Sequence, residues 1–280
     1  MEYTKVTFSI ANESIQEALA AMAEQLGFDG FEFTNDALLA FVPTDLFDTK
    51  QVDELLAAIP DFQAIAYTHE PLPNINWNEE WEKNYPPVLI GNDIYIRASF
   101  HPSDTGARYE IVINPKMSFG TGHHETTWMM AETMLAEDFS GKRVLDFGSG
   151  TAILAILAAK MGAGSVLAID HEEWAYKNAL ENVELNGIAN VHVIHGDEMA
   201  IPSTSFDTVL ANVNKNVIIG NLHRLSQATS NGGFLYLSGL LEEDAQPVID
   251  AALPFGFELQ QQKQRNRWIC LKLIKNIKGR

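Results

Sequence analysis

A glycine turn between an apolar strand and a helix is the first feature of this sequence that could bind a ligand. The segment "KRVLDFGSGTAILAI" (142–156) runs from a strand-like stretch through Gly148 and Gly150 into an Ala/Ile/Leu helix pattern. Glycines let backbone N–H groups approach a ligand without an intervening Cβ, and the start of a helix favours a negative group. Ligands of doubly wound sheets bind at such turns, so a ligand site is predicted here.

The residues around the turn separate three candidate ligands. A nicotinamide or flavin fingerprint has a small residue at its third glycine position, but Ile153 stands there. A phosphate-binding P-loop needs Gly-Lys-Ser/Thr, which this turn lacks. Asp146, two residues before the first glycine, would repel a pyrophosphate but could help to bind an ammonium group. S-adenosylmethionine carries an ammonium, a carboxylate and an adenosine, and it is the predicted cofactor.

Two further acids are placed to bind the nucleoside. Asp170 ends the predicted strand "SVLAID", 20 residues after Gly150, where a carboxylate can accept hydrogen bonds from ribose hydroxyls. A dinucleotide would use a similar acid, and Asp170 could also cap the helix that begins "HEEWAYKN". Asp197, in "HGD" after the next strand, is expected to meet the adenine amino group.

The sequence gives little support for a metal site or a serine nucleophile. His123 and His124 are adjacent, so they would point to different sides and make a poor chelating pair, and no metal site is predicted. The serines lack the Gly-x-Ser-x-Gly turn of a nucleophile elbow. No catalytic residue or general base is assigned.

Strict alternation of strands and helices from residue 142 onward predicts an α/β fold with a mainly parallel, doubly wound, Rossmann-like sheet. The last two strand candidates, "FELQQQKQ" and "WICLKLIK", have only "RNR" between them. This connection is too short for a crossover helix, so the two strands must form an antiparallel hairpin. Residues 85–280 are predicted to form this domain.

Residues 1–68 predict a separate small domain. Strand, helix, strand, strand, helix and strand patterns follow one another, an order typical of a ferredoxin-like α+β sandwich. The segment "HEPLPNINWNEEWEKN" (69–84) is interpreted as a linker with a short helical turn in "NEEWEKN". Trp77 and Trp81 would share one face of that turn and hold the linker against a domain.

The charge of the chain is concentrated near its start. The net charge is −18, from 19 Lys and Arg against 37 Asp and Glu, which opposes direct binding to DNA or RNA. Residues 1–70 hold thirteen acidic residues and two lysines, a net of −11. This acidic region is either a solvated surface or a landing site for a basic partner.

The cysteine count, the first residues and the longest apolar run all favour the same cellular location. The single cysteine, Cys270, excludes an internal disulfide and suits a reducing environment. The first residues lack a basic region followed by an apolar core, and the longest apolar run, "AILAILAA", is too short to cross a bilayer. A soluble, cytoplasmic protein without membrane contact is expected.

Three segments together suggest a family: "NPKMSFGTGHHETT" (114–127), "DFGSG" (146–150) and "LANVN" (210–214), behind a small acidic domain. In this combination the chain resembles the ribosomal protein methyltransferase A family, bacterial class I S-adenosylmethionine-dependent methyltransferases that modify large-subunit ribosomal protein eleven. The resemblance covers essentially the whole chain, and "FGTGHHETT" is its specific part.

The resemblance implies a protein N-methyltransferase that modifies lysine ε-amines, and an N-terminal α-amine, of ribosomal protein eleven. S-adenosylhomocysteine would be its product, and the small domain would recognise the substrate. It also implies cofactor contacts from Thr127, Gly148, Asp170 and Asn212, although Thr127 could instead cap the helix that begins beside it. Phe119, Gly120 and Thr121 would form a loop over the methionine end. With the residues derived above, the candidate cofactor-binding set is Phe119, Gly120, Thr121, Thr127, Asp146, Gly148, Gly150, Asp170, Asp197 and Asn212.

Two motifs depart from the family pattern. The family usually has Cys and then Gly-Ser-Gly after its first glycine, where this chain has "SGTA". The motif "NVNKN" keeps Asn212, but it differs from the Asn-Ile-Leu of many relatives and from the Asn-Pro-Pro-Tyr of enzymes that methylate planar nitrogens. The alternatives are a class I methyltransferase acting on RNA or a small molecule, a cofactor-binding protein without transferase activity, and an NAD-dependent reductase.

Overall fold

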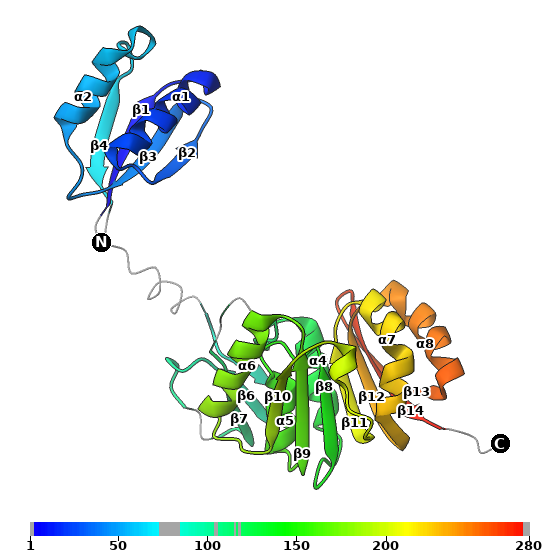
Figure 1. Ribbon diagram of the computed structural model, residues 1–280. Coiled ribbons are helices and arrows are strands. Elements are labelled where there is room, and N and C mark those ends of the chain that lie inside the picture. The colour runs from blue at the N-terminus through cyan, green and yellow to red at the C-terminus, as the bar shows by residue number, and fades with distance from the viewer. Residues whose placement is uncertain (1–2, 73–84, 104–105, 115, 117–118, 277–280) are drawn as a thin grey trace. The chain divides into compact units, whose positions relative to one another are not determined.

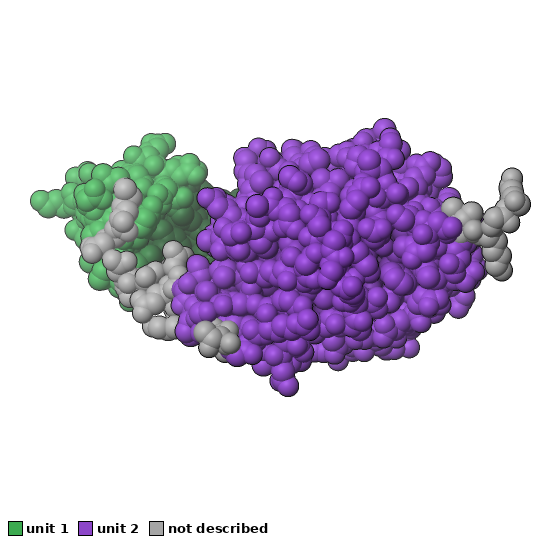
Figure 2. Space-filling model, turned by 90° about the horizontal axis from the view of Figure 1, so that it is seen from below, with its two compact units in different colours: residues 1–84 green, residues 85–280 purple. Residues whose placement is uncertain are grey.

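The computed structural model describes residues 3–72, 85–103, 106–114, 116 and 119–276. The chain divides into two compact units, residues 1–84 and 85–280, which are green and purple in Figure 2. The clusters of buried hydrophobic side chains share no residue between the units. The helical turn predicted at Trp77 and Trp81 lies outside the described residues.

The smaller unit is a four-stranded antiparallel sheet with two helices (Figure 1). Its elements are β1 (Tyr3–Ser9), α1 (Glu13–Ala23), β2 (Gly30–Phe33), β3 (Ala37–Pro43), α2 (Thr49–Ala58) and β4 (Tyr67–Pro71). The strand order is β2-β3-β1-β4, so the predicted ferredoxin-like arrangement is confirmed. Strand β4 continues to Pro71, three residues into the segment predicted as a linker.

Burial in the smaller unit follows the strand period of two. In β1, Val6 and Phe8 are buried while their neighbours are more exposed, and β3 repeats the pattern with Leu38 and Ala40 opposite them. Helix α1 adds Leu19 to this core, and Asn12 caps its start with a side chain that accepts a hydrogen bond from the Ile15 N–H at 3.2 Å. The core of this unit is therefore complete within residues 3–72.

The larger unit contains a seven-stranded sheet of order β10-β9-β8-β11-β12-β14-β13. The strands are β8 (Arg143–Phe147), β9 (Ser165–Asp170), β10 (Val191–His195), β11 (Phe206–Asn212), β12 (Thr229–Leu241), β13 (Phe257–Arg265) and β14 (Trp268–Lys275). Strands β8 to β12 are parallel, and β14 runs antiparallel to both β12 and β13. The predicted doubly wound sheet and its C-terminal hairpin are confirmed. The order reverses between β8 and β11, which marks the crevice where such sheets bind ligands.

Helices cover both faces of this sheet. The helices are α4 (Glu125–Met134), α5 (Ile153–Lys160), α6 (Glu173–Leu185), α7 (Lys215–Ala228) and α8 (Ala245–Ala252). The first three share one hydrophobic cluster, and α7 and α8 contribute to another. A second, three-stranded sheet of β5 (Val88–Ile90), β6 (Ile94–Arg97) and β7 (Tyr109–Val112) belongs to the first cluster. In the described part of the chain no helix has the length and apolarity needed to span a bilayer.

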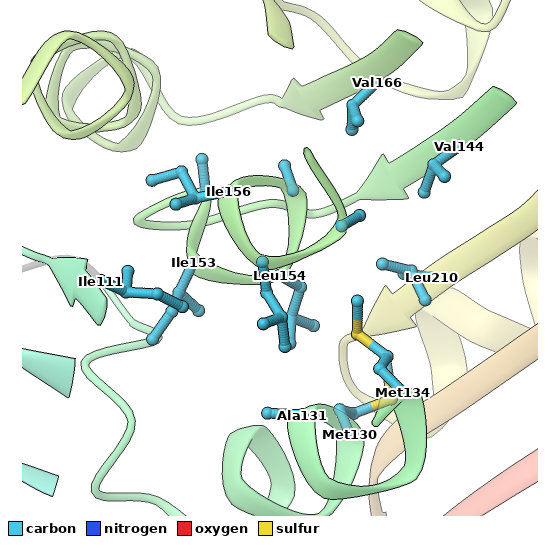
Figure 3. Close-up of a cluster of buried hydrophobic side chains, with 14 of the residues drawn as sticks. Ile111, Met130, Ala131, Met134, Val144, Ile153, Leu154, Ile156, Val166 and Leu210 are labelled. Atoms are coloured by element: carbon cyan, nitrogen blue, oxygen red, sulfur yellow. The ribbon is translucent and has the colours of Figure 1, made fainter. Parts of the chain in front are cut away.

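Helix α5 fixes the glycine turn because it is apolar on every side. Its first six residues, Ile153 to Ala158, are all buried. Figure 3 shows Leu154 in one cluster with the strand side chains Val144 and Leu210 and the α4 methionines Met130 and Met134. A turn that continues into so fully buried a helix has little freedom to shift.

Candidate cofactor site

A cavity of about 630 Å³ lies at the carboxyl ends of the parallel strands. Its wall includes residues from the turn after β8, the end of β9, the turn after β10 and the end of β11. Both its position at the strand-order reversal and its size are those of a small-molecule site.

The structure brings most of the predicted site residues to this cavity. Six of the ten line it: Phe119, Gly148, Gly150, Asp170, Asp197 and Asn212. The other four, Gly120, Thr121, Thr127 and Asp146, do not line it. Two of these four, Gly120 and Thr127, are hydrogen-bonded to residues of the turn or of the wall, as described below.

The N–H groups of the glycine turn are used within the protein. Gly148 and Ser149 both donate to the Ile169 carbonyl, at 2.9 and 3.1 Å, and Gly150 donates to Asp170 Oδ2 at 2.7 Å. The expectation that these N–H groups approach the ligand is therefore wrong for this turn. Since a pyrophosphate needs such donors, their use elsewhere argues against a dinucleotide.

The two glycines are required by neighbouring protein atoms. Gly148 has φ +71°, and a Cβ there would lie 2.3 Å from Val213 Cγ1. Gly150 has φ +54°, and a Cβ there would lie 2.3 Å from the Phe119 carbonyl oxygen. Both positions combine a left-handed backbone with a close approach, so each favours glycine on two counts.

Asp146 has a structural role at the start of α5. Its side chain is 1 % exposed, and Oδ2 accepts a hydrogen bond from the Ala155 N–H at 3.0 Å. The carboxylate therefore occupies the positive end of this helix, the place where a ligand anion was expected. Burial is the main cause that raises the pKa of Asp146 to about 7; the hydrogen bond from the Ala155 N–H opposes this rise, and the nearby Asp170 charge adds to it.

Asp170 lines the cavity, and its carboxylate uses only some of its hydrogen-bond acceptor positions within the protein. Besides Oδ2, which accepts from Gly150, Oδ1 accepts from the Glu172 N–H at 3.0 Å. Each oxygen has two acceptor positions, so hydroxyl donors can still be bound. Helix α6 has Glu172 at its N-cap, so the alternative that Asp170 caps this helix is wrong. These two N–H donors orient the carboxylate at the cavity edge.

Asn212, in the cavity wall, is paired with the buried Thr127, which does not line the cavity. Asn212 Nδ2 donates to Thr127 Oγ1 at 3.2 Å. Thr127 does not cap α4, because His124 holds the N-cap position and its Nδ1 accepts the Thr126 N–H. Asn212 Oδ1 is buried and has no hydrogen-bond partner among the described residues. Such an orphaned acceptor is costly unless a ligand donor reaches it.

Asp197 lines the cavity beyond Asp170. Its Oδ1 accepts the Met199 N–H at 2.8 Å and so caps a short 3-10 helix, Glu198–Ala200. This local hydrogen bond fixes a carboxylate in the cavity wall.

An aromatic wall that includes a residue missed from the sequence closes part of the cavity. His124 lies between Phe119 and Trp268, with ring centroids 5.1 and 4.8 Å apart, and all three line the cavity. Trp268 opens β14, and nothing in the apolar run "RWICLKLI" distinguishes it from a core residue. The usable signal was its place beside the "RNR" turn, at the end of a sheet strand.

A parallel sheet with an antiparallel C-terminal hairpin and a nucleotide-sized cavity after its first strand define the class I methyltransferase fold. The model of the family "Ribosomal protein L11 methyltransferase (PrmA)" matches residues 3–276. The chain belongs to this family.

Relatives and solved structures agree with this assignment. Ribosomal protein L11 methyltransferases of Porphyromonas gingivalis and Phocaeicola vulgatus are 38% and 37% identical to the chain. The first alignment covers 97% of both chains, and the second covers 98% of this chain and 99% of the relative. The crystal structure of a ribosomal protein L11 methylase from Lactobacillus delbrueckii subsp. bulgaricus is similar with a TM-score of 0.63 and 25% identity, over 69% of this chain and 100% of that one. A methyltransferase from Pyrococcus furiosus, 17% identical with a TM-score of 0.52 over 60% of this chain and 90% of that one, shares the fold.

Proposed function

We propose that this protein transfers methyl groups from S-adenosylmethionine to amine nitrogens of ribosomal protein L11, chiefly lysine ε-amines. The observation that carries the proposal is the orphaned Oδ1 of Asn212, a buried acceptor at a nucleotide-sized cavity edged by Asp170. Family membership supports the same reaction.

The residues present fit this cofactor. Asp170 would accept the ribose hydroxyls, Asp197 would accept the adenine amino group, and Asn212 Oδ1 would accept a donor from the methionine half. Phe119 to Thr121 would cover that half. Bound S-adenosylmethionine supplies a methyl group already activated on a sulfonium, and S-adenosylhomocysteine is what remains. The protein has to align the amine and keep water out.

The aromatic wall suits an amine acceptor. Phe119, His124 and Trp268 present apolar ring surface, which disfavours a charged ammonium and so lowers the pKa of an entering lysine. Nδ1 of His124 accepts the Thr126 N–H, so the neutral ring carries its proton on Nε2. His124 is therefore not proposed as a base. The entering lysine would release its proton to water before methyl transfer, and desolvation would favour this release.

The acidic small unit would recognise the substrate. Residues 1–70 have a net charge of −11, which complements a basic ribosomal protein and raises its rate of encounter. Direct nucleic-acid binding is disfavoured by the same charge. Segment 69–84 joins this unit to the catalytic one, so a change of orientation there would let several amines reach one cavity. A cytoplasmic location would follow from this substrate.

Incubation of the full-length protein with tritiated S-adenosylmethionine and total ribosomal proteins tests the proposal. Label confined to L11, stable to ribonuclease, is the expected result. Label in RNA or in a small-molecule fraction, with none in L11, would overturn it.

A further inference from the structure

Thr151, the residue after Gly150, is bonded through all its polar atoms. Its N–H donates to the Phe119 carbonyl at 3.0 Å, and its Oγ1 donates to the Gly120 carbonyl at 2.5 Å. Its own carbonyl accepts from Asn182 Nδ2 at 3.0 Å. Thr151 is fully buried, so these contacts are shielded from competing water. They join the glycine turn to Phe119–Gly120 and to helix α6.

Asn182 also forms a hydrogen bond to a second segment of the chain. It is fully buried on α6, and its Oδ1 accepts the Asn114 N–H at 2.8 Å. One side chain thus binds both the glycine turn and the chain that leaves β7. Neither Thr151 nor Asn182 lines the cavity. Both therefore act on the site through other residues.

Two glycines allow the close contact between Phe119–Gly120 and the glycine turn. A Cβ on Gly150 would lie 2.3 Å from the Phe119 carbonyl oxygen, and a Cβ on Gly120 would lie 2.9 Å from Thr151 Oγ1. Side chains at either position would push the two segments apart. Phe119 itself lines the cavity, and its ring packs 5.1 Å from His124. What fixes the Phe119 backbone therefore fixes one wall of the site.

We propose that Thr151 is a positioning residue for the methyl donor, whose hydroxyl holds Phe119–Gly120 against the glycine turn and so keeps the Phe119 ring on the cavity. This proposal rests on the proposed function. Loss of the hydroxyl leaves the Gly120 carbonyl without its donor and shifts the segment toward a released form. Since apparent affinity falls with the fraction of competent protein, donor binding weakens by about tenfold while bound donor still reacts.

The test compares Thr151→Val with Thr151→Ser, which keeps the hydroxyl, in the full chain. Thr133→Val is the matched control, because Thr133 is also a buried threonine but donates to the Met129 carbonyl within α4. Three quantities are measured: the dissociation constant of S-adenosylhomocysteine, the KM for S-adenosylmethionine against kcat, and the rate of chymotrypsin cleavage after Phe119 in protein without ligand. If Thr151→Val fails to fold, Thr151→Ala replaces it.

The expected result is about tenfold weaker binding, a raised KM with kcat within about twofold, and faster cleavage after Phe119 in Thr151→Val. Thr151→Ser and Thr133→Val should resemble the unsubstituted protein. Equal affinity and equal cleavage in Thr151→Val would overturn the proposal, as would failure of serine to restore them. If the unsubstituted protein binds no S-adenosylhomocysteine, the proposed function fails, while the cleavage rates still test the hydrogen bond.

Discussion

Asn212 Nδ2 donates a hydrogen bond to Thr127 Oγ1 at 3.2 Å, across 85 residues of sequence. The bond fixes the amide plane and leaves Oδ1 buried, with no hydrogen-bond partner among the described residues, on a residue of the cavity wall. Two residues that resemblance alone had associated with the cofactor are thus one unit, in which Thr127 would orient Asn212 and Asn212 would bind the cofactor.

Replacing Asn212 by alanine should lower kcat/KM for S-adenosylmethionine by roughly tenfold to a hundredfold, because a buried hydrogen bond to the ligand is lost. Thr127→Val, which removes only the orienting partner, should have a smaller effect. Steady-state kinetics of both variants and of the double variant measure the coupling. Additive effects would mean that Thr127 does not act through Asn212.

Replacing Asp170 by asparagine should weaken S-adenosylhomocysteine binding by about tenfold or more, because a charged acceptor of two hydroxyls becomes neutral. Asparagine keeps the shape but only one acceptor oxygen, so either the Gly150 or the Glu172 N–H loses its acceptor, and the thermal midpoint should fall, though less than in Asp170→Ala. Calorimetric titration of the asparagine variant provides the measurement. Unchanged affinity would remove Asp170 from the site.

Asp146 should make folding stability fall as pH rises. Its pKa is raised from 3.8 to about 7 in the folded chain, so between these values the folded form keeps a proton that the unfolded form has released. This contribution is fully present below the unfolded pKa and is lost as pH rises through the folded one. Between pH 5 and 8 it amounts to about 2–3 kcal/mol.

Asp146→Asn isolates this contribution, because asparagine retains an oxygen for the Ala155 N–H but does not titrate. Urea unfolding of both proteins at pH 5 and pH 8 should show a smaller pH-dependent loss in the variant. Identical losses in the two proteins would show that Asp146 ionises normally.

Removing residues 1–84 should preserve cofactor binding but abolish recognition of the protein substrate. The hydrophobic clusters of the larger unit contain no residue of the smaller one, so residues 85–280 are expected to fold and to bind S-adenosylhomocysteine with unchanged affinity. Methyl transfer to L11 should fall to background. Full transfer by the truncated chain would contradict the role given to the acidic unit.

Features set by neighbours in sequence were predictable. The three residues of "RNR" are too few for a crossover, so the antiparallel pairing of β13 and β14 was determined locally. Asp170 was also predictable as a cavity residue, because it ends a parallel strand and such ends share one edge of the sheet. Asn212, which only the family resemblance indicated, lines the cavity from the end of another parallel strand.

Features that depend on residues far apart in the sequence were not predictable. The Phe119 carbonyl takes the space beside Gly150 only because a loop 31 residues earlier in the chain returns to the turn. Trp268 reaches His124 from the far end of the chain, and no local pattern marks that meeting. Asp146 was predicted to contact the ligand. Its structural role was not predictable, because its hydrogen bond with the Ala155 N–H forms only when α5 is packed.

Calorimetric titration of the full-length protein with S-adenosylhomocysteine, and separately with NADH, tests most directly whether the cavity after β8 holds an S-adenosyl amino acid and not a dinucleotide. One equivalent of S-adenosylhomocysteine should bind, and NADH should neither bind nor compete, since the turn has no N–H groups left for a pyrophosphate. Binding of NADH with no heat from S-adenosylhomocysteine would contradict the proposed function at its base.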